Sequence, residues 1–111
     1  MKTIIALLSV RFLSQAMADA PAEPAVAHRY LIERTFPPGA LEGLNAASKV
    51  KINSINSEFG VRWITSYANA DKTRTFCVYE GPSETAVREA ATANGIPVDS
   101  VTEVPVTLSP E

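Results

Sequence analysis

The sequence predicts one α+β domain whose elements follow the order β-α-β-β-α-β. Four short runs are rich in β-branched and aromatic residues, which favours strands, and two longer segments carry apolar residues at helical spacing. The chain has 111 residues, which suffices for a single domain. Two successive β-α-β halves of this kind build the ferredoxin-like sandwich of one sheet and one helical layer.

The first half is expected to contain a strand and a long helix. The strand covers residues 29–35, and a Pro-Pro-Gly turn at 37–39 ends it. The helix is expected between residues 41 and 59, because a stripe of mostly apolar residues recurs there at steps of three or four: Leu41, Leu44, Ser48, Ile52, Ile55 and Phe59. Gly60 follows this stripe and ends the helix.

The second half is expected to begin with a hairpin of strands 61–68 and 73–80, joined by the polar residues 69–72. A tight turn around Ala70 and Asp71 would place Trp63 opposite Val78. Cys77 would then lie opposite Ile64 and face away from Trp63.

A second helix and a last strand complete this half. Ser83 is the expected N-cap of the helix, and Gly95 follows its last residue, Asn94. The last strand is expected at 100–106. Pro105 has no backbone N–H to give to a sheet, so this strand should lie at an edge or form a bulge there.

Residues 1–18 are typical of a secretory signal peptide. They combine a positive start, an apolar stretch at 4–10 and a small-x-small cleavage site at 16–18. Arg11 interrupts the apolar stretch, so the alternative is a misassigned start or a cytoplasmic extension.

Cleavage after Ala18 would leave an Ala- and Pro-rich tether at 19–27, followed by the folded domain at 28–108. We therefore expect a periplasmic or secreted protein. No apolar run in the sequence approaches the eighteen or more residues of a membrane span, so no membrane attachment is expected after cleavage.

Charge and composition exclude several classes of function. The formal net charge of −2 provides no basic surface for nucleic acid. One cysteine excludes an internal disulfide framework, and one histidine excludes a multi-histidine metal cage within one chain.

Few residues could carry chemistry. Cys77 lies in mid-strand, where a lone thiol is either a metal ligand, a redox-sensitive nucleophile or a small buried residue. Glu33 is either an oxygen ligand or base in a cavity, or one half of a structural salt bridge. Glu89 follows Arg88 in the second helix, where such a pair is normally solvated. His28 lies at the junction of tether and strand, where we expect it to be flexible.

Five segments together resemble the bacterial nickel-responsive small-protein family, over about residues 29–106. They are Tyr-Leu-Ile-Glu-Arg-Thr-Phe-Pro-Pro-Gly (30–39), Val-Arg-Trp-Ile-Thr-Ser-Tyr (61–67), Lys-Thr-Arg-Thr-Phe-Cys-Val-Tyr-Glu-Gly-Pro-Ser (72–83), Ala-Val-Arg-Glu-Ala-Ala (86–91) and Gly-Ile-Pro-Val-Asp-Ser-Val-Thr-Glu-Val (95–104). The resemblance implies a ferredoxin-like fold, a homodimer whose sheets face each other in an α/β-barrel-like assembly, and nickel or another divalent transition metal as ligand.

The resemblance also bears on the ligands. Family members often carry a histidine directly after the glutamate of the second helix, where this chain has Ala90. The donors that this chain keeps are Cys77, Glu33 and Glu89. It also keeps Glu103 and Tyr79. We expect specific divalent binding to need Cys77 and at least one nearby carboxylate, with Glu33 as the first choice. Binding should be weaker without that imidazole.

Three functions follow in order of preference. The first is a small extracytoplasmic protein that binds a nickel-type divalent ion. The second is a non-catalytic dimeric module that binds a small molecule or a protein. The third is a cofactor-free enzyme of the dimeric α/β-barrel type, for which Glu33 and Tyr79 form the one candidate polar pair.

Overall fold

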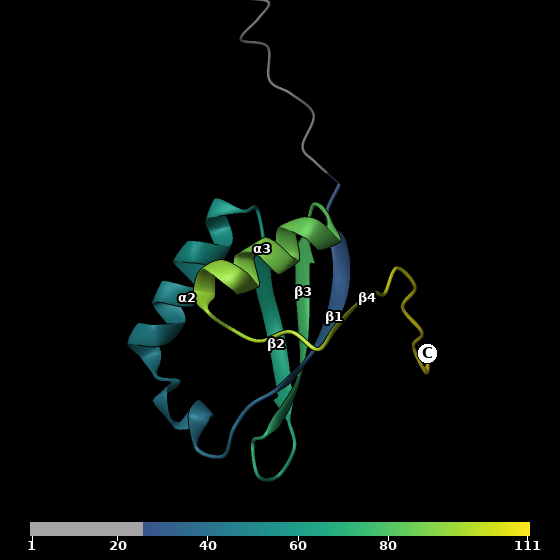
Figure 1. The fold of residues 1–111 in the computed structure, drawn as a ribbon. Helices are drawn as coiled ribbons and strands as arrows, with labels where there is room; N and C mark the ends of the chain where they lie inside the picture. Colours follow the sequence, from purple (N-terminus) through teal and green to yellow (C-terminus); the bar gives the residue numbers. More distant parts are fainter. Residues whose placement is uncertain (1–25) are drawn as a thin grey trace, which may run out of the picture.

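The computed structural model describes residues 26–111, so the expected signal peptide at 1–18 and residues 19–25 of the expected tether lie outside the described residues. The elements in chain order are β1 (His28–Thr35), the 3-10 turn η1 (Ala40–Gly43), α2 (Ala46–Glu58), β2 (Arg62–Ala68), β3 (Arg74–Gly81), α3 (Glu84–Asn94) and β4 (Ser100–Glu103) (Figure 1). No helix within residues 26–111 is long and apolar enough to cross a membrane.

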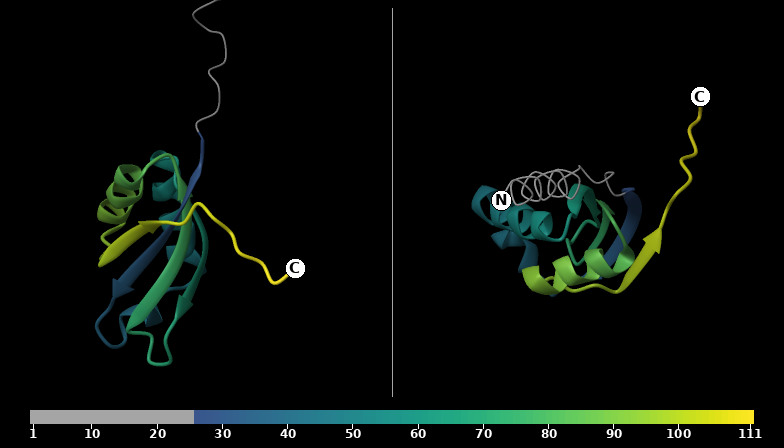
Figure 2. Two further views of the ribbon diagram at one scale, coloured as in Figure 1. Left: turned by 90° about the vertical axis from the view of Figure 1, so that its right-hand side faces the viewer. Right: turned by 90° about the horizontal axis from the view of Figure 1, so that it is seen from above.

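The four strands form one antiparallel sheet in the order β2-β3-β1-β4. Both helices lie on the same face of this sheet, and the opposite face is open (Figures 1 and 2). The β-α-β-β-α-β order and the central place of β1 confirm the predicted ferredoxin-like α+β fold.

The first helix is shorter than the stripe from Leu41 to Phe59 predicts. The chain forms the 3-10 turn η1 first, and α2 begins only at Ala46. Asn45 causes this break, because its Oδ1 accepts a hydrogen bond from the Ser48 amide at 2.9 Å. The Ser48 hydroxyl in turn accepts one from the Asn45 amide at 2.8 Å, which completes a capping box.

The β2–β3 hairpin has a different register from the expected one. Its loop is longer than a two-residue turn, since the Asn69 amide donates to the Arg74 carbonyl at 3.1 Å and Ala68 pairs with Thr75. The register also shifts at a bulge between Trp63 and Thr65. Trp63 therefore lies opposite Tyr79, and Cys77 lies opposite Ser66 instead of Ile64. As a result, Trp63 and Cys77 face the same side of the sheet.

Helix α3 begins and ends where its predicted capping residues place it. Ser83 accepts a hydrogen bond from the Ala86 amide at 3.1 Å, and Gly95 has the left-handed φ of +68° that ends many helices. The last strand is shorter than expected, because β4 ends at Glu103, two residues before Pro105.

The hydrophobic core lies between the centre of the sheet and α3. Its largest fully buried apolar side chains are Ile32 on β1 and Val87 on α3, at 0% and 1% exposure. Gly81 at the end of β3 permits this close packing, since a Cβ there would lie 3.2 Å from Val61 Cγ2 and 3.3 Å from Val87 Cγ2.

Candidate functional site

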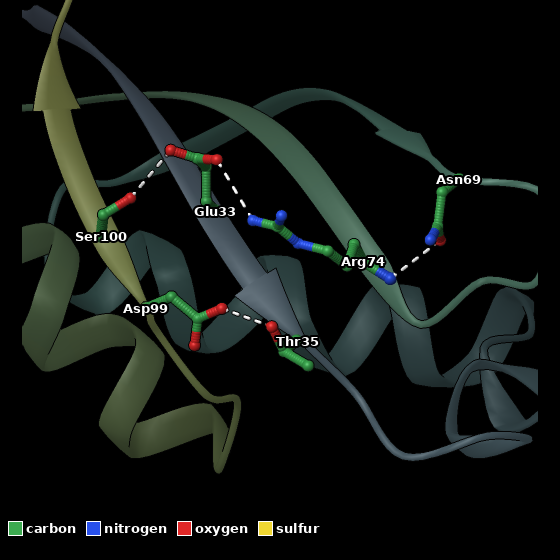
Figure 3. Close-up of polar contacts among 6 residues, drawn as sticks. All are labelled: Glu33, Thr35, Asn69, Arg74, Asp99 and Ser100. Carbon is green, nitrogen blue, oxygen red and sulfur yellow. Dashed lines mark hydrogen bonds and ion pairs between the residues drawn. The ribbon is translucent and has the colours of Figure 1, made fainter.

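Glu33 lies on the open face of the sheet and is held by neighbours within the domain. Its carboxylate accepts a hydrogen bond from the Ser100 hydroxyl at 3.0 Å and pairs with Arg74 Nη2 at 3.3 Å (Figure 3). Beside it, the Thr35 hydroxyl donates to Asp99 at 2.5 Å, which ties the start of β4 to β1. This arrangement is the structural salt bridge that the sequence left open as one of two interpretations.

Cys77 lies on the other face of the sheet, in the core beneath the helices. It is 5% exposed, and its neighbour on β1 is Ile32. The Cys77 thiol donates to the Thr75 hydroxyl at 3.6 Å, a contact that also lies within the buried layer. Glu33 pairs with Phe76 in the same register, so the thiol and this carboxylate point to opposite sides.

Glu89 lies on a helix and not on the sheet with Glu33 and Cys77. It lies on the exposed side of α3, beside Phe59 and Arg88. Within residues 26–111 the structure contains no group of three or more His, Cys, Asp or Glu side chains that could hold a metal ion. The set Cys77, Glu33 and Glu89 is therefore not brought together within one chain, because strand alternation separates the first two. Glu33 and Tyr79 are separated for the same reason.

His28 is better ordered than the sequence predicts. It is the first residue of β1 and pairs with Gly81 on β3. Its Nδ1 lies 3.0 Å from Glu103 Oε2 on β4, and both side chains are nearly half exposed. Sequence reasoning missed this pair because residues 28 and 103 meet only through the register of β1 with β4, which no local pattern reveals.

A cavity of about 610 Å³ lies on the helix side of the sheet. Its walls come from η1 and α2 on one side and from β2 and β3 on the other, and Trp63, Cys77 and Tyr79 line it. The Trp63 indole N–H donates to the Ser66 hydroxyl at 2.8 Å, which holds the ring in place.

Arg34 is a buried cation in the wall of this cavity. It is 3% exposed, its Nη1 donates to the Pro97 carbonyl at 2.7 Å, and its guanidinium carbon lies 5.5 Å from the centre of the Tyr79 ring. Burial raises the pKa of Tyr79, and the Arg34 charge acts in the opposite direction. The phenol is therefore neutral at physiological pH and can act as a hydrogen-bond donor.

Comparison with known proteins agrees with this fold. The chain is similar to the crystal structure of SCO4226 from Streptomyces coelicolor A3(2), with a TM-score of 0.62 and 18% sequence identity over 72% of this chain and 99% of that chain. No curated protein matches the chain. The family model described as nickel responsive protein SCO4226-like matches residues 30–104, which is more than half of the sequence. The chain therefore belongs to the SCO4226-like family of nickel responsive proteins.

Proposed function

We propose that this protein is a small extracytoplasmic homodimer that binds a divalent ion of the nickel type. Membership of the nickel responsive family supports the choice of metal. The contact between His28 and Glu103 carries the proposal, because it places the one imidazole of the chain against a carboxylate at 3.0 Å.

The chemistry of the available donors favours this pair over the thiol. A borderline ion such as nickel prefers nitrogen and sulfur ligands. The Cys77 sulfur is enclosed in the core, so an ion could reach it only if the helical layer opened. The side chains of His28 and Glu103 are 40% and 46% exposed, so an ion can reach both without a change in the fold.

Two donors leave the coordination of a divalent ion incomplete. Water or donors from a second copy must fill the remaining positions, and we therefore expect modest affinity. Binding also requires the neutral imidazole, so it should weaken as the pH is lowered.

The open face of the sheet supports the homodimer. Leu31, Phe76 and Val78 are half-buried there, and Tyr67 is 66% exposed. Neither helix lies on this face (Figure 2). A second copy packed against it would bury these apolar groups. Light scattering at micromolar concentration should give the mass of two chains, and Val78→Glu should shift it to the mass of one.

The extracytoplasmic location rests on the signal-peptide pattern at residues 1–18. N-terminal sequencing of the protein from its native host should find Asp19 first. A retained Met1 on cytoplasmic protein contradicts this part of the proposal.

Calorimetric titration with nickel chloride tests the metal site. We expect His28→Ala to abolish specific binding and Glu103→Gln to weaken it about tenfold. Cys77→Ser is the matched control and should bind as the wild type does. Loss of binding in Cys77→Ser, with His28→Ala unaffected, would instead favour the thiol site expected from the sequence. Absence of binding by the wild-type protein contradicts the proposal as a whole.

A further inference from the structure

The cavity beneath α2 is lined by an excess of cationic side chains. Three cationic side chains line it, Arg34, Lys49 and Lys72, and no aspartate or glutamate of residues 26–111 does. The chain as a whole carries more acidic than basic residues. With three cations and no carboxylate from the described part of the chain, this cavity favours an anion.

Arg34 differs from every other arginine in residues 26–111. Each of the others forms an ion pair with a carboxylate at 3.3 Å or less and lies at the surface: Arg29, Arg62, Arg74 and Arg88. Arg34 is 3% exposed, and no carboxylate of the described residues lies within ion-pair distance of it. Its Nη1 donates a hydrogen bond to the Pro97 carbonyl, which is a neutral acceptor. A buried guanidinium without a counter-ion is costly, and an anionic ligand would supply what is missing.

The rest of the cavity wall suits an apolar group. Its apolar lining includes Trp63, Leu41, Leu44 and Ile52. Its volume of about 610 Å³ is within the range of pockets that enclose small organic ligands. The neutral phenol of Tyr79 lines the same space and can donate a second hydrogen bond to an anion.

We propose that this cavity binds a small amphipathic carboxylate, with its carboxylate on Arg34 and its apolar body against Trp63 and α2. The planar guanidinium matches the two oxygens of a carboxylate. One buried positive charge balances one negative charge, which favours a monocarboxylate over a phosphate with close to two charges. Lys49 and Lys72 are exposed residues at the margin and would attract the anion during entry. This site is separate from the metal pair His28 and Glu103.

Phenylbutyrate and its neutral isostere phenylbutyramide test the site, with EDTA present so that no metal contributes. The single tryptophan, Trp63, reports directly on the cavity through its fluorescence, and calorimetry gives the affinity. We expect saturable binding of phenylbutyrate with a Kd below about 1 mM. The amide should bind at least about tenfold more weakly, because it cannot form the charged hydrogen bond to Arg34.

Variants assign the effect to the cavity. Arg34→Lys keeps the charge but not the planar fork, and it should weaken phenylbutyrate binding about tenfold. Arg62→Gln removes an exposed arginine outside the cavity and should bind as the wild type does. Ile52→Trp fills the apolar end from the half-buried side of α2 and should block binding of acid and amide alike.

The comparison of acid and amide on the wild-type protein remains decisive even if Arg34→Lys does not fold. Equal binding of the two compounds, no binding of either, or unchanged affinity in Ile52→Trp would each overturn the proposal.

Discussion

The two halves of the helical layer are packed very differently. Three residues of α3 are buried against the sheet, Val87, Ala90 and Ala91. The longer α2 has one buried residue, Asn56, whose Nδ2 atom has no hydrogen-bond partner among the described residues. Asn94 of α3 donates to Asn56 Oδ1 at 3.0 Å, so the two helices meet at a polar contact.

This difference shows how one small sheet can combine a filled core with a hollow. The small residues of α3, together with Gly81, allow its backbone to approach β3 closely, and the space between them is filled. The side chains of α2 that face the sheet are polar or half-exposed, so the helix covers the sheet without filling the space beneath it. We infer that the α3 half provides most of the stability and that the α2 half is free to bind.

The largest expected difference compares two isoleucines. Ile32→Ala removes a fully buried side chain beneath α3 and should lower the free energy of unfolding by about 2–5 kcal/mol. Ile52→Ala makes the same change in the wall of the cavity, where atoms already lack neighbours, and should lower it by about 1 kcal/mol or less. Urea unfolding measures both. Equal losses would show that the cavity is closed in solution and would remove the distinction between the halves.

A pair of glycines provides the next test. Gly81→Ala places a methyl group 3.2 Å from Val61 Cγ2 and 3.3 Å from Val87 Cγ2, so both valines must move by a few tenths of an ångström. Both are buried, which makes this movement costly. We expect a loss of about 1–3 kcal/mol in thermal or urea unfolding. Gly43→Ala is the control beside the cavity, where a Cβ would meet nothing within 4 Å. A stable Gly81→Ala protein would mean that the α3 half is looser than its packing indicates.

The smallest expected effect is on the open face of the sheet. An exposed ion pair there provides a comparison for the buried residues of the two halves. Glu80 accepts from Arg29 at 2.9 Å and from Arg62 at 2.8 Å, and these hydrogen bonds hold its pKa below the usual 4.5. A lowered pKa in the folded state adds stability above about pH 4.5, and this contribution disappears as the pH falls through the folded value.

Glu80→Gln should therefore be slightly less stable than the wild type at pH 7 and equally stable in acid. Thermal unfolding across this pH range measures the difference. Glu58→Gln, which has no ion-pair partner among residues 26–111, is the control. A gap between Glu80→Gln and the wild type that persists in acid would show that the charge is not its cause.

Local patterns were sufficient to predict most of the fold. The strand runs, the Ser83 cap and the stop at Gly95 were recognisable because each depends on residues close together in the chain. The first helix was predicted too long, since the apolar stripe continues through Asn45, whose side chain begins a new helix there. The hairpin register was wrong because loop length and a bulge at β2 changed which residues face each other.

The sequence by itself determined the order of elements, the ferredoxin-like α+β class and the small set of residues that could bind a ligand. Only the tertiary structure decided which of them meet. Strand pairing placed Cys77 and Glu33 on opposite faces and brought His28 to Glu103. It also left Arg34 buried with no carboxylate of residues 26–111 at ion-pair distance. The physical reason is that periodicity is a local property of the chain, whereas contacts across 75 residues, such as that between His28 and Glu103, depend on the register of a whole sheet.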